Sequence, residues 1–382
     1  MRSSRVPWRE LALSLAAVAL CVGLAEAWVR WRRVDLNPSA TFRFHPAYGW
    51  TMEAGIRRPA PPGTADPSLP PGTGALRLLF VGDSFTFAIE QAEGNGFPGL
   101  LAKRLAPRGV EVRTLASGGW GTGQELIALR REGLAWAPHV VVLQVFPYND
   151  LCNNTLGLAD TCSRLDEHRP YFVLDGDHLR ATWLHPWHAR GRNALRLFGL
   201  AENLWLWEGL VAEGETQREF QGRSAGWARA NARAKGLEHS GNVYALMPEE
   251  GQPAVVREGW RVTEALFAAF HDELAARDVA LVVVVVPFLR TLEGWDYFRR
   301  YHRAPLVADY ATSRVERFFA RRGVPTLSVR RRIVESGEAP RHAFNRRNLH
   351  LSGQGHQRLA EWLEESLRSE RLLPAADGTP GV

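Results

Sequence analysis

The chain has 382 residues, of which 45% are hydrophobic and 23% are charged. This composition, with a mean hydropathy of −0.22, excludes an intrinsically disordered chain and a membrane protein with many spans. Three cysteines are too few for a disulfide-rich scaffold. The net charge of +6 leaves a nucleic-acid-binding protein open at this point.

Residues 1–33 have the pattern of a membrane segment. The apolar run 11–29 is interrupted only by Glu26 and is flanked by arginines on both sides. At about 1.5 Å rise per residue, it nearly spans a hydrocarbon core of roughly 30 Å. We predict a signal anchor that is retained, because Trp28 and the arginines after it are typical of a membrane interface. A signal peptide with an A-x-A cleavage site at 25–27 is the alternative.

The net charge is concentrated in the same segment. Residues 1–33 contain six arginines against two glutamates, which gives +4, so residues 34–382 carry only +2 of the total of +6. The basic excess is therefore a topology signal, and no nucleic-acid partner is expected. The rest of the chain is predicted to lie on the exported side of the inner membrane, tethered by a single span through residues 11–29.

Export also determines the expected state of two cysteines. In an oxidising compartment Cys152 and Cys162, ten residues apart, can form a disulfide, and two free thiols are the alternative. No Cys or His pair surrounds them at zinc spacing, so no metal site is expected. The glycine-rich stretch 118–123 lacks the order and the downstream acid of a dinucleotide fingerprint, and we expect no cofactor.

Beyond residues 34–75, which are rich in Pro and Gly and predicted to be a linker, the sequence alternates between strands and helices. Strands are expected at 76–81, 110–115, 139–145, 280–286 and 324–329, and helices at 97–105, 124–134, 262–276, 309–322 and 353–368. Strands that are nearly continuous in apolar residues and alternate with helices predict a parallel sheet covered on both faces. The predicted fold is α/β, a flavodoxin-like three-layer α/β/α domain over residues 76–372, with an N-terminal transmembrane helix.

Residues 151–258 do not follow this alternation and are interpreted as an insertion. A hairpin signal lies at 171–177, and an apolar helix rich in tryptophan is expected at 195–210. The tryptophans of the insertion are more typical of helix packing than of a carbohydrate groove. Residues 373–382 are predicted to be a flexible tail.

Polar residues follow several of the predicted strands. Asp83 and Ser84 come after the first strand, a glycine-rich loop at 117–123 follows the second, and Asn149 follows the third. His350 lies just before the last helix. Ligands of a doubly wound sheet bind at the carboxyl ends of its strands, so these groups can converge. A hydroxyl, a base and hydrogen-bond donors are the groups that nucleophilic catalysis requires.

Four short blocks, GDSFTF, GGWGTGQE, YND and HLSGQGH, occur in this order. They resemble the motifs of the SGNH (GDSL-like) hydrolase superfamily, in the branch with an N-terminal membrane segment. The resemblance covers about residues 76–150 and 262–368. Thr114 stands where the family usually has Asn, and Pro147 where many members have Gly.

The resemblance implies a role for each matching residue. Ser84 would be the nucleophile and His350 the general base that takes its proton. The backbone N–H groups of Ser84 and Gly119 and the side-chain amide of Asn149 would form the oxyanion hole. Gly119 also has an independent reason, because a backbone N–H can approach a substrate closely where no Cβ intrudes.

Three further polar residues near these motifs are interpreted as structural. Asp83 and Asp150 are expected to accept hydrogen bonds from backbone amides in the turns. His356 lies six residues beyond His350, which is not the i,i+4 spacing of a helical metal site, and is expected to pack.

One position departs from the family. Members usually have an Asp two or three residues before the histidine, whereas this chain has Asn348 and Arg347 there. Asn348 is the candidate third catalytic residue, since its amide oxygen can hold the His350 ring as in Cys-His-Asn sites. An acid supplied from elsewhere in the fold and a weak enzyme are the two alternatives.

The predicted function is that of an exported, membrane-tethered serine esterase. It would remove O-acyl groups, O-acetyl above all, from an envelope or secreted carbohydrate or from an acylated small molecule, through an acyl-Ser84 intermediate. An O-acyltransferase that uses the same site is one alternative. A catalytically impaired carbohydrate-binding or assembly protein on this scaffold is the other. The sequence does not predict an oligomeric state.

Overall fold

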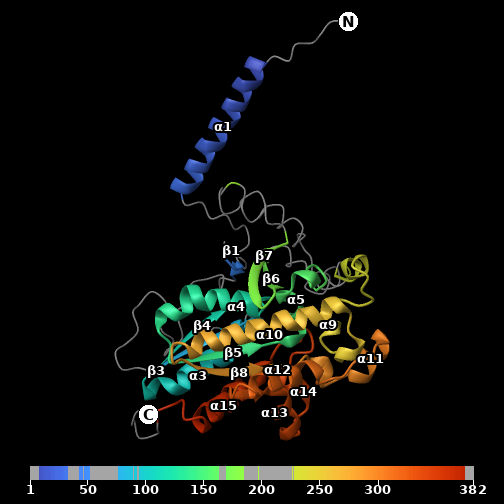
Figure 1. The fold of residues 1–382 in the computed structure, drawn as a ribbon. Helices are drawn as coiled ribbons and strands as arrows, with labels where there is room; N and C mark the ends of the chain where they lie inside the picture. Colours follow the sequence, from blue (N-terminus) through green and yellow to red (C-terminus); the bar gives the residue numbers. More distant parts are fainter. Residues whose placement is uncertain are drawn as a thin grey trace.

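The computed structural model describes residues 8–32, 43–45, 47–51, 76–88, 90–92, 94–162, 169–184 and 228–374, together with residues 197 and 226. The helix predicted at 195–210 lies outside these residues, except for residue 197. The predicted tail also lies outside them from residue 375 onward. Figure 1 shows the described elements as coloured ribbons.

A five-stranded parallel sheet forms the centre of the domain. Its strands, in spatial order, are β4 (Val110–Ala116), β3 (Leu76–Gly82), β5 (Val140–Val145), β8 (Ala280–Val285) and β9 (Thr326–Ser328). In chain order this arrangement is 2-1-3-4-5, which is the flavodoxin-like order. The prediction of an α/β fold with a central parallel sheet is therefore confirmed.

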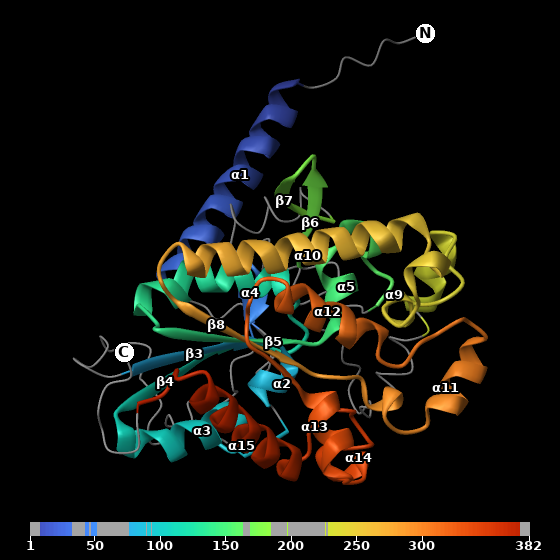
Figure 2. The same ribbon diagram turned by 60° about the horizontal axis from the view of Figure 1, so that its bottom comes forward.

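Helices cover both faces of this sheet, as Figure 2 shows. One layer contains α4 (Thr122–Ala128), α10 (Ala254–Ala275) and α12 (Tyr310–Ala320), and the other contains α3 (Phe97–Leu105), α13 (Val329–Ser336) and α15 (Gly353–Ser369). Successive residues of β3 alternate between the two cores: Leu79 packs with α10 and α12, and Phe80 packs with α3 and α15. Because both faces of the sheet are buried, its central strands are mostly apolar, and Arg77 of β3 and Gln144 of β5 are their polar residues.

The largest differences from the predicted helix ranges are in α10 and α4. Helix α10 begins at Ala254, eight residues before the predicted start at 262, because Val256 and Trp260 continue its buried face. Helix α4 ends at Ala128, and a π-helical turn (Leu129–Gly133) and a 3-10 turn (Leu134–Trp136) follow it.

The N-terminal helix α1 (Trp8–Trp31) contains the apolar run predicted at 11–29. Among the described residues it is the one helix long and apolar enough to cross a membrane, by length and composition. It extends away from the sheet and its helices (Figure 1), and most of its apolar side chains are exposed.

Part of the predicted linker is folded. Strands β1 (Arg43–His45) and β2 (Gly49–Thr51) pair as an antiparallel hairpin. Tyr48 and Trp50 are buried against Trp120, which precedes α4. The structure thus differs from the linker prediction at these residues, because two aromatic side chains find a buried site on the domain although Pro and Gly dominate the surrounding sequence.

The predicted insertion contains a second hairpin, of β6 (Pro170–Asp175) and β7 (His178–Trp183), where the sequence has its hairpin signal. Helix α5 (Pro147–Asn154) leads into the insertion, and the short helix α9 (Gly241–Tyr244) lies near its end. The structure joins Cys152 of α5 to Cys162 as a disulfide, with 6.2 Å between the Cα atoms.

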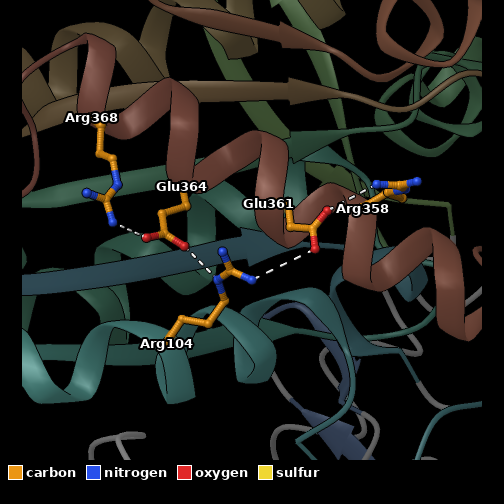
Figure 3. Close-up of polar contacts among 5 residues, drawn as sticks. All are labelled: Arg104, Arg358, Glu361, Glu364 and Arg368. Carbon is orange, nitrogen blue, oxygen red and sulfur yellow. Dashed lines mark hydrogen bonds and ion pairs between the residues drawn. The ribbon is translucent and has the colours of Figure 1, made fainter. Parts of the chain in front are cut away.

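A network of ion pairs joins α3 to α15 (Figure 3). Arg104 Nε of α3 donates to Glu364 Oε2 at 2.6 Å, and Arg368 donates to the other oxygen of the same carboxylate. Glu361 lies 3.9 Å from Arg104 and 3.5 Å from Arg358. Glu364 is the buried member of this set, whereas the Glu361 side chain is 45% exposed.

Replacing Glu364 with Gln is expected to lower the free energy of unfolding by about 1 kcal/mol at neutral pH, because both arginines are half exposed and water screens their charges. Burial raises the pKa of Glu364, but its hydrogen bonds to Arg368 and Arg104 outweigh burial and leave the pKa below its usual value of 4.5. The stabilisation is therefore complete above about pH 4.5 and is lost as the pH falls through the folded pKa. Urea unfolding at pH 7 and pH 3 measures this, with Glu361→Gln as the exposed control. An equal effect of both substitutions would contradict the prediction.

Candidate active site

Ser84 lies at a tight turn between a strand and a helix. Strand β3 ends at Gly82, and α2 (Ser84–Phe87) begins at Ser84. The Asp83 carboxylate caps this turn by accepting a hydrogen bond from the Phe85 amide at 2.9 Å. A Cβ on Gly82 would lie 2.3 Å from Thr86 Oγ1, so only glycine fits before the turn. The turn leaves Ser84 partly accessible at the carboxyl end of the sheet.

The structure brings Ser84 together with His350, a residue 266 positions away. His350 Nε2 lies 2.8 Å from Ser84 Oγ, which is hydrogen-bonding distance. The Phe85 ring lies edge-on to the imidazole, with 5.0 Å between the ring centroids. The hydroxyl and the base predicted from the sequence are therefore in the geometry that proton transfer between them requires.

Asn348 does not hold the His350 ring. Its side-chain oxygen accepts a hydrogen bond from the backbone N–H of His350 at 3.2 Å. Between them Leu349 has a φ of 66°, a left-handed conformation that turns the chain sharply. Asn348 thus stabilises the turn that presents His350, and the prediction that its amide orients the imidazole is corrected.

A carboxylate that the sequence analysis did not identify contacts the other ring nitrogen. Glu90 Oε1 lies 2.7 Å from His350 Nδ1, an ion-pair contact in which the oxygen is off the line of the N–H bond. The Glu90 side chain is 21% exposed and that of His350 25%. Burial raises the pKa of Glu90, but the contact with His350 outweighs it and leaves the pKa below its usual value. Glu90 thus lies beside the ring nitrogen for which the sequence suggested Asn348 or an acid supplied from elsewhere in the fold.

The local backbone explains how Glu90 reaches the ring. Helix α2 is a single turn that ends at Ala88 in a left-handed conformation, with a φ of 53°. The amide of Gln91 donates to the carbonyl of Ala88 at 2.9 Å, so the chain reverses direction after α2. Glu90 is thereby returned toward Ser84. In the sequence, Glu90 is a single carboxylate six residues after Ser84, and this spacing does not belong to any motif that would have identified it.

The two other predicted oxyanion donors lie on the neighbouring loops. Gly119 is in the turn after β4, has a φ of 76° and is partly exposed. Asn149 is in α5, after β5, and its Nδ2 donates to Asp83 Oδ2 at 3.2 Å. Asp83 therefore contacts both the turn that carries Ser84 and the amide of Asn149. Since β4 and β5 flank β3, both loops open at the same end of the sheet as Ser84.

Asp150 connects two of these loops. Its Oδ1 accepts hydrogen bonds from the amide and the hydroxyl of Thr122, both at 2.9 Å, and its Oδ2 accepts from the amide of Phe146 at 2.9 Å. Burial, and then the charge of Asp83, raise the pKa of Asp150 to about 7. Both aspartates have the backbone amide partners that their structural interpretation requires.

A third carboxyl group, Glu125 of α4, is buried near this pair. Burial raises its pKa well above the usual value of 4.5, and the charges of Asp150 and Asp83 raise it further. Burial and the two neighbouring carboxylates therefore favour the protonated form of Glu125 in the folded protein. Because its pKa is higher in the folded than in the unfolded chain, Glu125 lowers the stability of the fold as the pH rises above about 4.5.

We expect Glu125→Gln to be as stable as the wild type at about pH 4 and more stable at about pH 8. The pKa of Glu125 is higher in the folded than in the unfolded chain, so the stability of the wild type falls as the pH rises above about 4.5, whereas the amide does not titrate. Urea unfolding at several pH values measures the difference. Glu335→Gln, at an exposed position, is the control and should show no such trend. A difference that does not depend on pH would contradict the raised pKa of Glu125.

His356 is a buried residue at the start of α15. Its Nδ1 accepts a hydrogen bond from the Phe97 amide at 3.2 Å, and the two rings stack. Burial lowers the pKa of His356 to about 4. Among the residues that the structure describes, no group of three or more His, Cys, Asp or Glu side chains is placed to hold a metal ion.

No protein-family model matches the chain, and neither does any curated protein. Similar solved structures include that of TesA, with 13% identity and a TM-score of 0.37 over 77% of this chain and 98% of TesA. Another is a mutant of Axe2, an acetyl-xylooligosaccharide esterase from Geobacillus Stearmophilus, with 15% identity and a TM-score of 0.41 over 78% and 96% of the two chains.

A GDSL-like lipase from Bacteroides thetaiotaomicron is similar at 11% identity and a TM-score of 0.39, over 79% and 92% of the two chains. At these identities and scores the likenesses carry no argument about activity, which depends on the geometry of the site.

Proposed function

We propose that the protein is a serine hydrolase that cleaves esters through an acyl-Ser84 intermediate. The observation that carries the proposal is the chain of contacts from Ser84 Oγ to His350 Nε2, at 2.8 Å, and from His350 Nδ1 to Glu90, at 2.7 Å. A nucleophile, a base and an acid in this order form the Ser-His-acid arrangement that recurs on unrelated folds. Ser84 as a simple helix cap would not account for the two contacts of His350.

In the acylation step, His350 Nε2 accepts the proton of Ser84 Oγ while the oxygen attacks the ester carbonyl. The carbonyl oxygen becomes an oxyanion, which the amide N–H groups of Ser84 and Gly119 and the side chain of Asn149 bind. Glu90 stabilises the imidazolium that forms on His350. The protonated Nε2 then gives its proton to the departing alcohol as the C–O bond breaks, which leaves acyl-Ser84.

Deacylation repeats these proton transfers with water. His350 takes a proton from a water molecule, the resulting hydroxide attacks the acyl carbonyl, and a second oxyanion forms in the same site. Its collapse breaks the bond to Ser84 Oγ, which recovers its proton from His350. The products are a carboxylic acid and an alcohol, and no cofactor takes part in these steps.

The proposed substrate is an O-acyl ester on a carbohydrate outside the cytoplasm. Half-buried aromatic side chains extend from the site and support this choice. Phe146 lies against Phe85, and Tyr148 stacks on Phe288 with 4.0 Å between ring centroids. Such rings present flat apolar faces on which a sugar ring can stack. The apolar helix α1 and the joined cysteines Cys152 and Cys162 support membrane tethering and export.

The full-length protein in detergent, offered p-nitrophenyl acetate and acetylated xylo-oligosaccharides, tests the activity. We expect turnover of the ester and labelling of Ser84 by a fluorophosphonate, located by peptide mass spectrometry. A protein that neither releases acetate nor labels at Ser84 is not a serine hydrolase. Product in which the acetyl group has moved to an added acceptor sugar, with water as the poorer acceptor, would replace hydrolysis with transfer.

A separate experiment tests the location. Alkaline phosphatase fused after Pro374 is expected to be active in a bacterial host, because the domain after α1 would be exported. An inactive phosphatase fusion, together with an active cytoplasmic reporter at the same position, would contradict export without affecting the proposed chemistry.

A further inference from the structure

The peptide unit between Gly118 and Gly119 determines where the predicted oxyanion donor points. The Gly118 carbonyl and the Gly119 N–H belong to this one planar unit, and they point in opposite directions because the described peptide bonds are trans. Whatever holds the Gly118 oxygen therefore also sets the direction of the Gly119 N–H.

The turn that contains this unit has two accessible forms. The Trp120 amide donates to the Ser117 carbonyl at 3.2 Å, and Gly119, the third residue of the turn, has a φ of 76°. This is the pattern of a type II turn, and in a type I turn the central peptide is rotated by about 180°. Because both central residues are glycine, neither form is excluded by a side chain. An outside contact is needed to select one of them.

The N-terminal hairpin supplies that contact. Trp50 Nε1 of β2 donates to the Gly118 carbonyl at 2.9 Å, and Trp50 is only 4% exposed. Gly118 is buried, whereas Gly119 is partly exposed, so the carbonyl faces the interior. A hydrogen bond accepted by the carbonyl also polarises the peptide and strengthens its N–H as a donor.

Neighbouring bonds fix Trp50 itself. Trp120 Nε1 donates to the Trp50 carbonyl at 2.7 Å, so the hairpin donates to the turn through the Trp50 indole and the turn donates to the hairpin through the Trp120 indole. Gln124 Nε2 of α4 donates to the Tyr48 carbonyl at 2.6 Å. The hairpin is thus held by the same loop and helix that it restrains.

Arg169, just before β6, holds the next peptide of the turn. Its Nη1 donates to the Gly119 carbonyl at 2.9 Å, and its guanidinium lies 4.8 Å from the centre of the Trp50 ring. Arg169 is buried, with 1% of its surface exposed. Both peptide units that meet at the Gly119 α-carbon are therefore held on the side of the hairpin: Trp50 binds the carbonyl of Gly118, and Arg169 binds the carbonyl of Gly119.

We propose that Trp50 is a positioning residue for the oxyanion-binding amide. Its indole N–H holds the Gly118–Gly119 peptide so that the Gly119 N–H faces the reacting carbonyl of the substrate. The hairpin formed by residues 43–51, which follows the membrane helix in the sequence, is then part of the machinery that stabilises the transition state. This inference rests on the proposed serine hydrolase function.

The test uses full-length Trp50→Phe, with active sites counted by fluorophosphonate titration. We expect kcat per active site to fall about ten- to hundred-fold, somewhat less than the 10²- to 10³-fold that loss of a whole oxyanion donor costs. KM should stay within about two-fold, because the donor acts on the transition state. The affinity for a trifluoromethyl ketone, which forms a tetrahedral oxyanion on the serine, should fall in parallel with kcat.

Two further variants separate positioning from folding. Trp136→Phe removes the same atoms from another buried indole, whose Nε1 has no hydrogen-bond partner among the residues that the structure describes, and should leave kcat unchanged. Site-specific replacement of Trp50 by 3-benzothienylalanine keeps the shape of the ring and removes only the N–H, and it should reproduce the loss of kcat.

The outcomes are distinct. Wild-type kcat and wild-type affinity for the ketone in the benzothienyl variant would overturn the role of Trp50 and leave the proposed function intact. A wild-type protein without turnover or labelling would overturn the proposed function and this inference with it. A parallel loss of kcat and of ketone affinity at constant KM supports the positioning role.

Discussion

Ser84→Ala is expected to reduce kcat/KM for p-nitrophenyl acetate by at least about 10⁴-fold, because loss of the serine nucleophile alone costs about 10⁶ in kcat in a serine protease. The Ser84 hydroxyl is the group within 2.8 Å of His350 Nε2, and alanine removes it without adding bulk. Residual hydrolysis would reflect water activated by His350 and binding in the remaining oxyanion site. Initial rates with ester substrate measure the effect.

A serine far from the site serves as the control for this prediction. Ser336 ends α13, and its hydroxyl donates to the Ile333 carbonyl at 2.9 Å. Ser336→Ala should therefore keep wild-type turnover and fluorophosphonate labelling. If Ser84→Ala retained more than about a tenth of the wild-type rate, the ester would be cleaved at a different group.

Glu90→Gln is expected to lower kcat by about 10²- to 10⁴-fold with little change in KM. An amide keeps the shape of the side chain but removes the negative charge that stabilises the imidazolium, and the equivalent change in a serine protease triad costs about 10⁴. Because the contact with His350 holds the pKa of Glu90 below its usual value of 4.5, the wild-type carboxylate is charged at neutral pH. Steady-state kinetics at pH 7 to 8 measure the change.

Asn348 supplies the matched comparison. Asn348→Asp keeps an oxygen that can accept the hydrogen bond of the His350 amide, so it should change kcat by no more than about three-fold. Glu90→Asp, which shortens the carboxylate by one methylene, should fall between the wild type and Glu90→Gln. A large gain of kcat in Asn348→Asp, with no loss of kcat in Glu90→Gln, would contradict the role of Glu90. It would indicate that the acid acts from position 348, where the family usually has it.

The sheet and most of the site follow from local sequence signals. Strands β3, β5 and β8 are buried on both faces, so each is a short run of mainly apolar residues. Such a run predicts a buried strand even when the strands that pair with it are unknown. Ser84, Asn149 and His350 could be grouped because the ends of parallel strands meet at one edge of the sheet.

The residues that were missed depend on contacts that no local pattern encodes. Glu90 contacts His350 because Ala88 adopts a left-handed conformation that reverses the chain. Alanine rarely adopts this conformation, and the local sequence does not predict it. Trp50 lies in a stretch dominated by Pro and Gly, and its burial depends on the Trp120 loop, seventy residues later. Asn348 was assigned to the ring because the sequence does not show that its oxygen bonds the backbone instead.

Ser84 and Glu90 belong to one short segment, whereas His350 comes from the opposite end of the chain. The imidazole therefore meets both partners only while the loop of residues 345–350 is seated, and displacing that loop would separate the base from its nucleophile and its acid in a single movement. In a site whose acid precedes the histidine on the same loop, base and acid would move together and remain paired. Here His350 would lose its contact with Glu90 at the same time as its contact with Ser84. The contacts among the three side chains therefore form or break together, according to the position of this one loop.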